Sequence, residues 1–342
     1  MLASSAKIKD NSLITSLVIQ PKETLPQPIL LQKSRAPHRI LALLNRLPWS
    51  LGIALGMILF LAPHPEWHGD LQVFRQSADT LRHPYYARWL FALLGALPEW
   101  AAYLLLEGGC TALLYLAVRV WKGRHWVMFL SFPFAWTLFY GQIDGIVVGG
   151  LALAWWALGR DQSVLLGAGL VLASIKPQVG LPVAIALWWW SKNRWKPLLI
   201  PALVLAVSFV QWGFWIPAWF AALFQTSDLV DLSRNLSLWT LTGPWILLVW
   251  IPIAFLPLPR PRKLAAVAAG TMLSVPYFPL SSSVLFLGMA VPWPFFAAVQ
   301  LPALTSLFGS YQVYDWLRLL PPALLLWASW PALVRLKQRG AK

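Results

Sequence analysis

The stretch that decides the fold runs from Tyr140 to Gln178 and reads YGQIDGIVVGGLALAWWALGRDQSVLLGAGLVLASIKPQ. Its apolar runs are broken by two short polar clusters, one around Gln142 and one around Lys176. One basic cluster precedes the stretch and another follows it. Because basic residues gather on the cytosolic side of a membrane, we expect the two polar clusters to form turns at the opposite face.

The spacing places both turns below the membrane surface. Gln142 lies 18 residues from both Arg124 and Arg160, and Lys176 lies 16 residues from both Arg160 and Lys192. At 1.5 Å per residue these spans are about 24–27 Å long, whereas the hydrocarbon core is about 30 Å thick. Polar backbone at that depth is tolerated only where it lines a cavity inside the protein. The sequence therefore predicts a polar cavity at these two turns.

The composition supports a membrane protein and argues against a nucleic-acid partner. Of the 342 residues, 58% are hydrophobic and only 11% are charged, whereas a soluble domain carries roughly a quarter of charged residues. The formal charge is +15, but Lys and Arg stand in short clusters between apolar runs, as the positive-inside rule requires. The single cysteine, Cys110, excludes an intrachain disulfide.

We expect an all-α, polytopic membrane protein with about ten to twelve transmembrane helices and short broken hairpins. Residues 1–45 should form a flexible cytosolic basic tail, residues 46–335 the membrane domain, and residues 336–342 a second cytosolic basic tail. The segment 64–88 should lie outside, with an interfacial helix over 71–81. The expected crossings are 47–61, 100–118, 126–140, 143–158, 164–175, 180–190, 198–220, 238–256, 264–278 and 319–334. Residues 284–310 should add either two short crossings or a re-entrant hairpin, because basic clusters at both termini require an even number.

Three motifs occur in an order that resembles a known family. The first is DLQVFRQSA from Asp70, followed by His83-Pro84-Tyr85; the second is the Gly141-Gln142-Ile143-Asp144 turn; the third runs from Gly167 to Lys176-Pro177. Together they resemble the polyprenol-phosphate-mannose-dependent mannosyltransferases, which are C-type (GT-C) membrane glycosyltransferases. The resemblance covers roughly residues 47–200. The later part departs from the family pattern, since it offers only Ser274-Val275-Pro276-Tyr277 and a serine triplet at 281–283.

The resemblance implies a reaction and its participants. The donor would be a hexose, mannose by analogy, on a polyprenyl phosphate in the bilayer, and the acceptor a hydroxyl of a glycolipid or glycan at the outer membrane face. No cofactor is implied. One carboxylate acting as general base is enough for an inverting displacement, and we assign Asp70 to that role. A cation should meet the phosphate charge, with Lys176 as the first choice and Arg75 as the second. The substrate-binding candidates are Gln142, Asp144, Lys176, Arg75 and Tyr85.

Each candidate also has a plainer interpretation. Asp70 follows a glycine before an apolar run and is a good helix cap. Lys176 is long enough to reach the headgroups from a buried position. Asp144 stands where the first turn of a helix favours negative charge. His64, Glu66, His68 and Asp70 resemble metal ligands, but their irregular spacing favours solvated loop residues. Glu107, in the middle of an apolar run, is expected to face the protein interior, with a structural role favoured over a place in a substrate path.

Two other classes of function compete with a glycosyltransferase. Short broken helices with a charge at their apex also build the substrate sites of secondary transporters and lipid-linked sugar flippases. No inverted repeat is visible in the sequence, which argues against that class. A non-catalytic membrane scaffold is the third interpretation, and it predicts that Asp70→Asn changes no product.

Overall fold

The computed structural model describes residues 48–76, 83–225, 235–308 and 313–340. The expected tail at 1–45 lies outside these residues, as do the end of the expected interfacial helix and the last two residues of the carboxyl tail. The described residues contain helices and no strand, apart from the isolated bridges Lys122–Met289 and Asn235–Pro279. The chain is an all-α, polytopic membrane protein.

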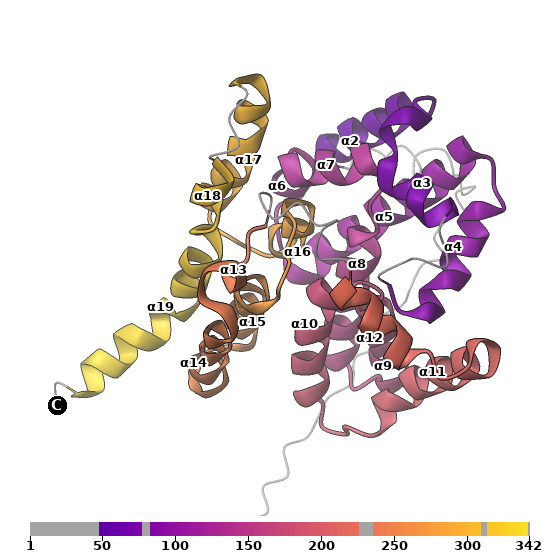
Figure 1. Cartoon of the computed structure of the whole chain (residues 1–342). Coiled ribbons are helices and arrows are strands. Elements are labelled where there is room, and N and C mark those ends of the chain that lie inside the picture. The colour runs from indigo at the N-terminus through magenta and orange to yellow at the C-terminus, as the bar shows by residue number, and fades with distance from the viewer. Residues whose placement is uncertain (1–47, 77–82, 226–234, 309–312, 341–342) are drawn as a thin grey trace, which may run out of the picture. The chain divides into compact units, whose positions relative to one another are not determined.

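The amino-terminal half forms helices close to the expected positions (Figure 1). An expected crossing at 126–140 is divided near Ser131 into α6 and α7, because Pro133 cannot donate a backbone hydrogen bond inside a continuous helix. The helices are α2 (Trp49–Leu61), α3 (Gly69–Gln76), α4 (Arg88–Gly95), α5 (Glu99–Trp121), α6 (His125–Phe129), α7 (Phe132–Tyr140), α8 (Asp144–Leu158), α9 (Ser163–Ser174) and α10 (Pro177–Trp189).

The carboxyl-terminal half is more broken than expected. The crossing expected at 198–220 is two helices bent by 86° around Gly213, whose φ of +69° continues neither helix. The crossing expected at 238–256 is interrupted by a 3₁₀ segment, Gly243–Val249. The helices are α11 (Leu199–Trp212), α12 (Ile216–Gln225), α13 (Trp239–Thr242), α14 (Trp250–Phe255), α15 (Arg260–Ser274), α16 (Val284–Leu287), α17 (Trp293–Phe308), α18 (Val313–Leu317) and α19 (Leu320–Gly340).

Few single helices are long enough to cross a bilayer. Among the described residues, α5 and the stretch Asp315–Val334 meet the length and composition needed, and up to four segments do if each bent helix pair counts as one span. One such pair is α7 with α8, which meet at 120°. The expected total of ten to twelve crossings stays a prediction.

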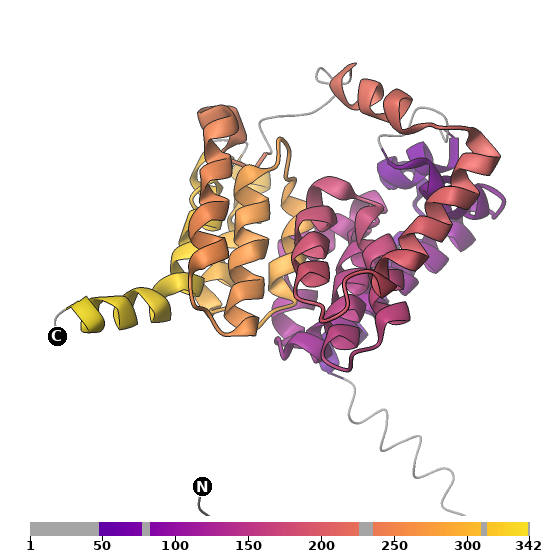
Figure 2. The same ribbon diagram turned by 90° about the horizontal axis from the view of Figure 1, so that it is seen from below.

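Helix α8 lies at the centre of the fold, between α5 on one side and α9 and α10 on the other. Small residues allow this close approach. A Cβ on Gly149 would lie 2.7 Å from Leu113 Cβ in α5, and one on Gly150 would lie 2.6 Å from Leu172 Cβ in α9. Farther along the chain α15 packs on both α10 and α19, and Figure 2 shows α15 and α19 side by side.

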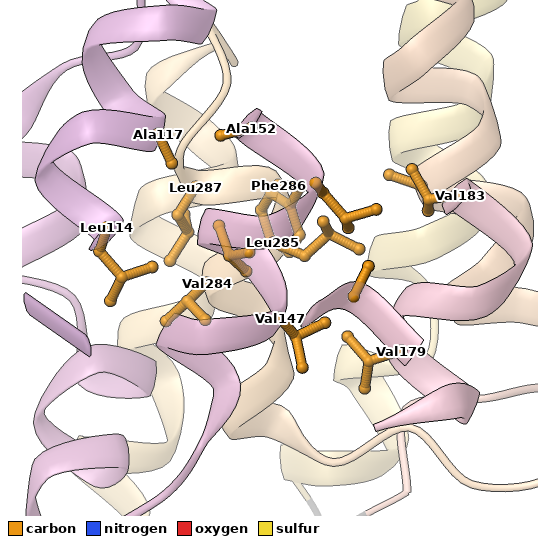
Figure 3. Packing of buried hydrophobic residues seen from close by; sticks show 14 of the residues in the cluster. Leu114, Ala117, Val147, Ala152, Val179, Val183, Val284, Leu285, Phe286 and Leu287 are labelled. Carbon is orange, nitrogen blue, oxygen red and sulfur yellow. The ribbon is translucent and has the colours of Figure 1, made fainter. Parts of the chain in front are cut away.

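The apolar core fills the space around α8. Figure 3 shows side chains of α5, α8 and α10 meeting the short helix α16. All four residues of α16, from Val284 to Leu287, are fully buried. Burying side chains of this size is the main favourable term in folding, so α16 fixes the 3₁₀ turn before it against α8.

Candidate active site

The turn between α7 and α8 is shaped by its caps. Ser131 caps α7 by accepting a hydrogen bond from the Phe134 amide at 3.2 Å. Gly141 ends α7 in the left-handed conformation, with φ of +69°, which glycine adopts without strain. The chain then bends into α8, whose first residue is Asp144. The two helices are bent by 120° at this turn.

The second turn joins α9 to α10 and carries Lys176. Pro177 begins α10 at a position where its missing N–H leaves no bond unmade. The segment 83–87 packs on this turn, because the Tyr86 hydroxyl donates to Ser174 Oγ at 2.7 Å and His83 Nδ1 donates to the Ile175 carbonyl oxygen at 2.9 Å. The hairpin that the sequence predicts over α9 and α10 is confirmed.

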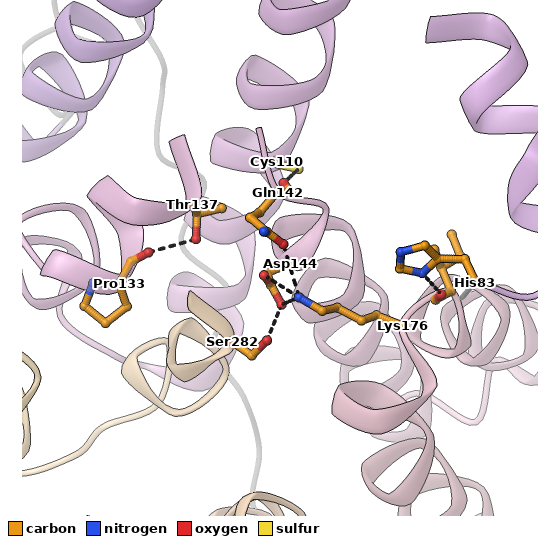
Figure 4. A network of polar contacts seen from close by, with 9 residues as sticks. His83, Cys110, Pro133, Thr137, Gln142, Asp144, Lys176 and Ser282 are labelled. Carbon is orange, nitrogen blue, oxygen red and sulfur yellow. Dashed lines mark hydrogen bonds and ion pairs between the residues drawn. The ribbon is translucent and has the colours of Figure 1, made fainter. Parts of the chain in front are cut away.

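The two turns meet in a buried ion pair (Figure 4). Lys176 Nζ lies 3.0 and 2.9 Å from the two Asp144 carboxylate oxygens, and 3.2 Å from Gln142 Oε1. Asp144 is fully buried and Lys176 is 6% exposed. A charge is costly to bury alone but is tolerated when it is paired and hydrogen-bonded. The sequence places these residues on neighbouring turns, and the structure brings them into direct contact.

Ser282 completes the cluster and is missing from the candidates drawn from the sequence. Its hydroxyl donates to Asp144 Oδ1 at 2.7 Å (Figure 4). Ser282 belongs to the 3₁₀ turn Leu280–Ser283, which α16 holds against the core. Its only sequence signal is the serine triplet at 281–283, since 138 residues separate it from Asp144.

The hydrogen bonds within the cluster determine which of its groups can bind a ligand. An ammonium has three N–H donors, and three oxygen atoms of Asp144 and Gln142 accept from Lys176. Both oxygens of Asp144 are likewise occupied, by Lys176 and by Ser282. Asp144 is therefore placed to hold the lysine. An anion can reach the ammonium by replacing the longest of its contacts, which is the one to the neutral Gln142 amide.

Asp70 lies beside this cluster. The start of α3 packs on the turn after α7, since a Cβ on Gly141 would lie 2.7 Å from Leu71 Cβ and one on Gly69 would lie 3.7 Å from the Tyr140 ring. The Asp70 carboxyl interacts electrostatically with Lys176 and Asp144. Burial raises the pKa of Asp70 to about 6; the Lys176 ammonium opposes this shift and the Asp144 carboxylate adds to it. A carboxyl group with that pKa takes and releases protons near neutral pH.

The family model that matches the chain is described as glycosyltransferase family 87, and it matches residues 83–310. The chain belongs to this family. No curated protein matches the chain, and no solved structure does. Gln142, Asp144, Lys176 and Ser282 lie within the matched residues of this glycosyltransferase, whereas Asp70 precedes them.

The other two sequence candidates of the glycosyltransferase contact different parts of the fold. Arg75 donates to the carbonyl oxygens of Leu94 and Leu97, at 3.3 and 2.8 Å, and lies 3.4 Å from a Glu99 carboxylate oxygen. It therefore fixes α3 to the turn between α4 and α5. The Tyr85 ring stacks on the Trp215 ring with 5.2 Å between centroids, and the Arg88 guanidinium lies over the Tyr85 ring, 3.6 Å from its centroid.

The loop before α3 has a compact structure of its own. His68 is buried, stacks on Tyr103 with 3.8 Å between ring centroids, and lies 3.1 Å from the Leu61 carbonyl oxygen through Nε2. His64 pairs with Glu66 at 3.2 Å. In the part of the chain that the structure describes, no three His, Cys, Asp or Glu side chains are grouped so that they could hold a metal ion.

Glu107 is a second buried acid in the glycosyltransferase. It lies in α5, is fully buried, and interacts electrostatically with Asp144. Neither of its carboxyl oxygens has a hydrogen-bond partner among the described residues, and the same holds for the Thr111 hydroxyl one turn later. It faces the interior as predicted.

Proposed function

We propose that this family 87 glycosyltransferase moves a hexose, with mannose as the first choice, from a polyprenyl-phosphate-linked donor to a hydroxyl of a glycolipid or glycan. The reaction takes place at the outer membrane face and inverts the configuration of the sugar. The observation that supports this proposal is a buried lysine, Lys176, held between the α7–α8 and α9–α10 turns with the Asp70 carboxyl group near enough to interact electrostatically with it.

Asp70 acts as the general base in this proposal. Its carboxylate takes the proton of the acceptor hydroxyl while the hydroxyl oxygen attacks the anomeric carbon of the donor sugar. The bond between that carbon and the phosphate oxygen breaks, and its electron pair stays on the phosphate. The products are the new glycoside, polyprenyl phosphate and a protonated Asp70, which then returns its proton to water. The phosphate is a good leaving group and needs no proton.

Lys176 meets the charge that develops on the phosphate. A phosphate oxygen takes the place of the Gln142 amide oxygen, while both contacts to Asp144 remain. The freed Gln142 amide then hydrogen-bonds hydroxyl groups of the sugar. Helices α8 and α10 both begin at this cluster, and the amino-terminal ends of helices favour an anion there.

The test is transfer in vitro from synthetic polyprenyl-phosphate sugars to a panel of glycolipid and glycan acceptors, with purified protein in lipid. The proposal requires sugar transfer with release of polyprenyl phosphate, and an anomeric configuration opposite to that of the donor. Comparison of mannose with other hexoses decides the sugar. Retention of configuration would overturn the displacement mechanism.

A transporter or lipid-linked sugar flippase is the second candidate. The bent helix pairs, at 120° and 86°, favour it because transporters also build binding sites from broken helices. Reconstituted vesicles distinguish the two. Sugar or lipid-linked sugar that crosses the bilayer without any glycosyl transfer would favour transport over catalysis.

A further inference from the structure

An apolar cavity of about 350 Å³ lies between α2 and α7. This volume is in the range of small-molecule pockets, which is about 300–1,000 Å³. The carboxyl-terminal end of helix α2 lines one side of the cavity, and residues along the whole length of helix α7 line the other side. The lining residues are Met57, Phe60, Leu61, Phe132, Ala135, Trp136 and Phe139. Every one of these side chains is apolar except for the single indole N–H of Trp136.

Aromatic contacts connect the cavity to the loop that precedes α3. Phe139, at one end of the lining, is three residues before Gln142. The Trp67 ring stacks on Phe139 with 5.7 Å between centroids, and Trp67 belongs to the loop that leads to Asp70. At the α2 side Phe60 contacts the same tryptophan, with 6.4 Å between ring centroids. One wall of aromatic rings therefore runs from the cavity to the loop that carries the proposed base.

We propose that this cavity holds the polyprenyl chain of the donor, starting with the isoprene units next to the phosphate. The inference rests on the proposed function, which places the phosphate at Lys176. A chain attached there must leave the polar cluster over an apolar surface, and the lining residue Phe139 is only three residues before Gln142. Flat aromatic side chains match the planar trisubstituted double bonds of an isoprenoid, and burying such a chain away from the mobile bilayer favours binding.

Ala135 provides the variant that tests the cavity. It lies one helical turn before Phe139, farther from the active site. Ala135→Trp should fill the cavity beyond the first isoprene unit. The Michaelis constant for a donor with a full-length polyprenyl chain should rise about tenfold or more, whereas that for a citronellyl donor, whose chain is short, should change much less. Leu203→Trp is the control, because Leu203 is 59% exposed on α11 and lines no part of the cavity.

The outcomes are distinguishable from failure of the proposed function. Transfer from the citronellyl donor by the wild type shows that the chemistry takes place, whatever the cavity does. Equal Michaelis constants of folded Ala135→Trp and wild type for the long donor would overturn the cavity assignment. A rise only in the Michaelis constant of a lipid acceptor would assign the cavity to the acceptor instead.

A second measurement does not depend on turnover or on a bulky variant. Photoreactive polyprenyl phosphate should label the peptide that contains Trp136 and Phe139, and excess unlabelled polyprenyl phosphate should prevent this labelling while a bilayer phospholipid should not. Equal competition by the phospholipid would identify an ordinary acyl-chain contact and would overturn the proposal. Ala135→Trp should reduce this labelling, because its side chain fills the cavity. If that variant does not fold, the smaller change Ala135→Leu should also reduce the labelling.

Discussion

At the scale of single residues, Asp70 links burial to chemistry. Its pKa of about 6 is raised because burial disfavours the charged form. We therefore expect kcat/KM of the wild type to fall as the pH drops below about 6, where the base of the free enzyme becomes protonated. The raised pKa also means that the folded state binds this proton more tightly than the unfolded state. Asp70 thus lowers the free energy of unfolding as the pH rises from about 4 to 6.

Asp70→Asn separates these two effects. The amide keeps the shape and some of the hydrogen bonding of the carboxyl group, but it cannot take a proton. Turnover at neutral pH should fall by roughly 10²- to 10⁴-fold, while donor binding is retained or becomes somewhat stronger, because the neutral amide no longer opposes the donor phosphate. The melting temperature at neutral pH should stay the same or rise, because a partly buried charge is gone. Unimpaired turnover in the folded variant would exclude Asp70 as the base and would leave it as an acidic residue in the first turn of α3.

Lys176 has a structural role that must be separated from any role in binding. Lys176→Met leaves the Asp144 carboxylate buried without its partner, which costs about 3–5 kcal/mol of stability. Adding Asp144→Asn should recover most of the melting temperature, because the uncompensated charge is removed. The donor affinity of this double variant should stay roughly 10- to 100-fold below that of the wild type. Lys176→Arg should retain part of the affinity.

The measurements are thermal unfolding and binding of a short-chain donor to the same purified variants. Donor affinity that returns together with stability in the double variant would show that Lys176 only maintains the fold.

The sequence could predict a charge at each turn, because the spacing of basic clusters locates both apices. It could not predict the contact between Lys176 and Asp144 or the part played by Ser282, since neither helical periodicity nor spacing encodes which turns meet.

At the scale of elements, the packing of α8 sets the geometry of the cluster. Helix α8 begins at Asp144 and α9 ends just before Lys176, so their separation fixes the length of the ion pair. Gly150→Ala would place a Cβ 2.6 Å from Leu172 Cβ and 2.7 Å from the Ala173 amide nitrogen. Overpacking of this kind costs about 1–3 kcal/mol. We expect a lower melting temperature and a lower turnover.

Gly108→Ala in α5 is the matched control. Nothing lies within 4 Å of the Cβ that this change would add, and alanine is the better helix former by up to about 1 kcal/mol. Its melting temperature should equal or exceed that of the wild type, with turnover unchanged. If both variants behave alike, the close approach of α8 and α9 does not control the site.

Helices with clear boundaries could be predicted, and broken ones could not. The pair α9 and α10 was expected because one long helix would bury Lys176, Pro177 and Pro182 in its middle. The breaks at Gly213 and over Gly243–Val249 went unpredicted. Both lie in runs whose hydrophobicity is continuous, and a glycine in an apolar run does not reveal in advance that it will adopt a positive φ.

At the scale of the whole molecule, the orientation in the membrane is a prediction that the arrangement of charge supports. Cysteine labelling tests it directly. Cys110 is buried, so Cys110→Ala provides a cysteine-free background. In that background Glu66→Cys should react with an impermeant maleimide in intact cells, because its side chain is 59% exposed on the expected outer segment. Lys192→Cys, at a side chain that is 81% exposed on the expected inner side, should react only after permeabilisation. The reverse pattern would invert the topology and move the proposed reaction to the cytosol.

The charges around Lys176 imply that binding of the donor is coupled to uptake of a proton from the solvent. Asp70 and Asp144 already oppose one lysine, so an incoming phosphodiester favours the protonated form of Asp70 and binding should take up a proton. By reciprocity, donor affinity weakens as the pH rises, while the chemical step gains. Polyprenyl phosphate carries more negative charge than the donor, so the proton taken from the acceptor is retained until this product leaves. Binding heats measured in buffers of different ionisation enthalpy would reveal the uptake, and identical heats would exclude it.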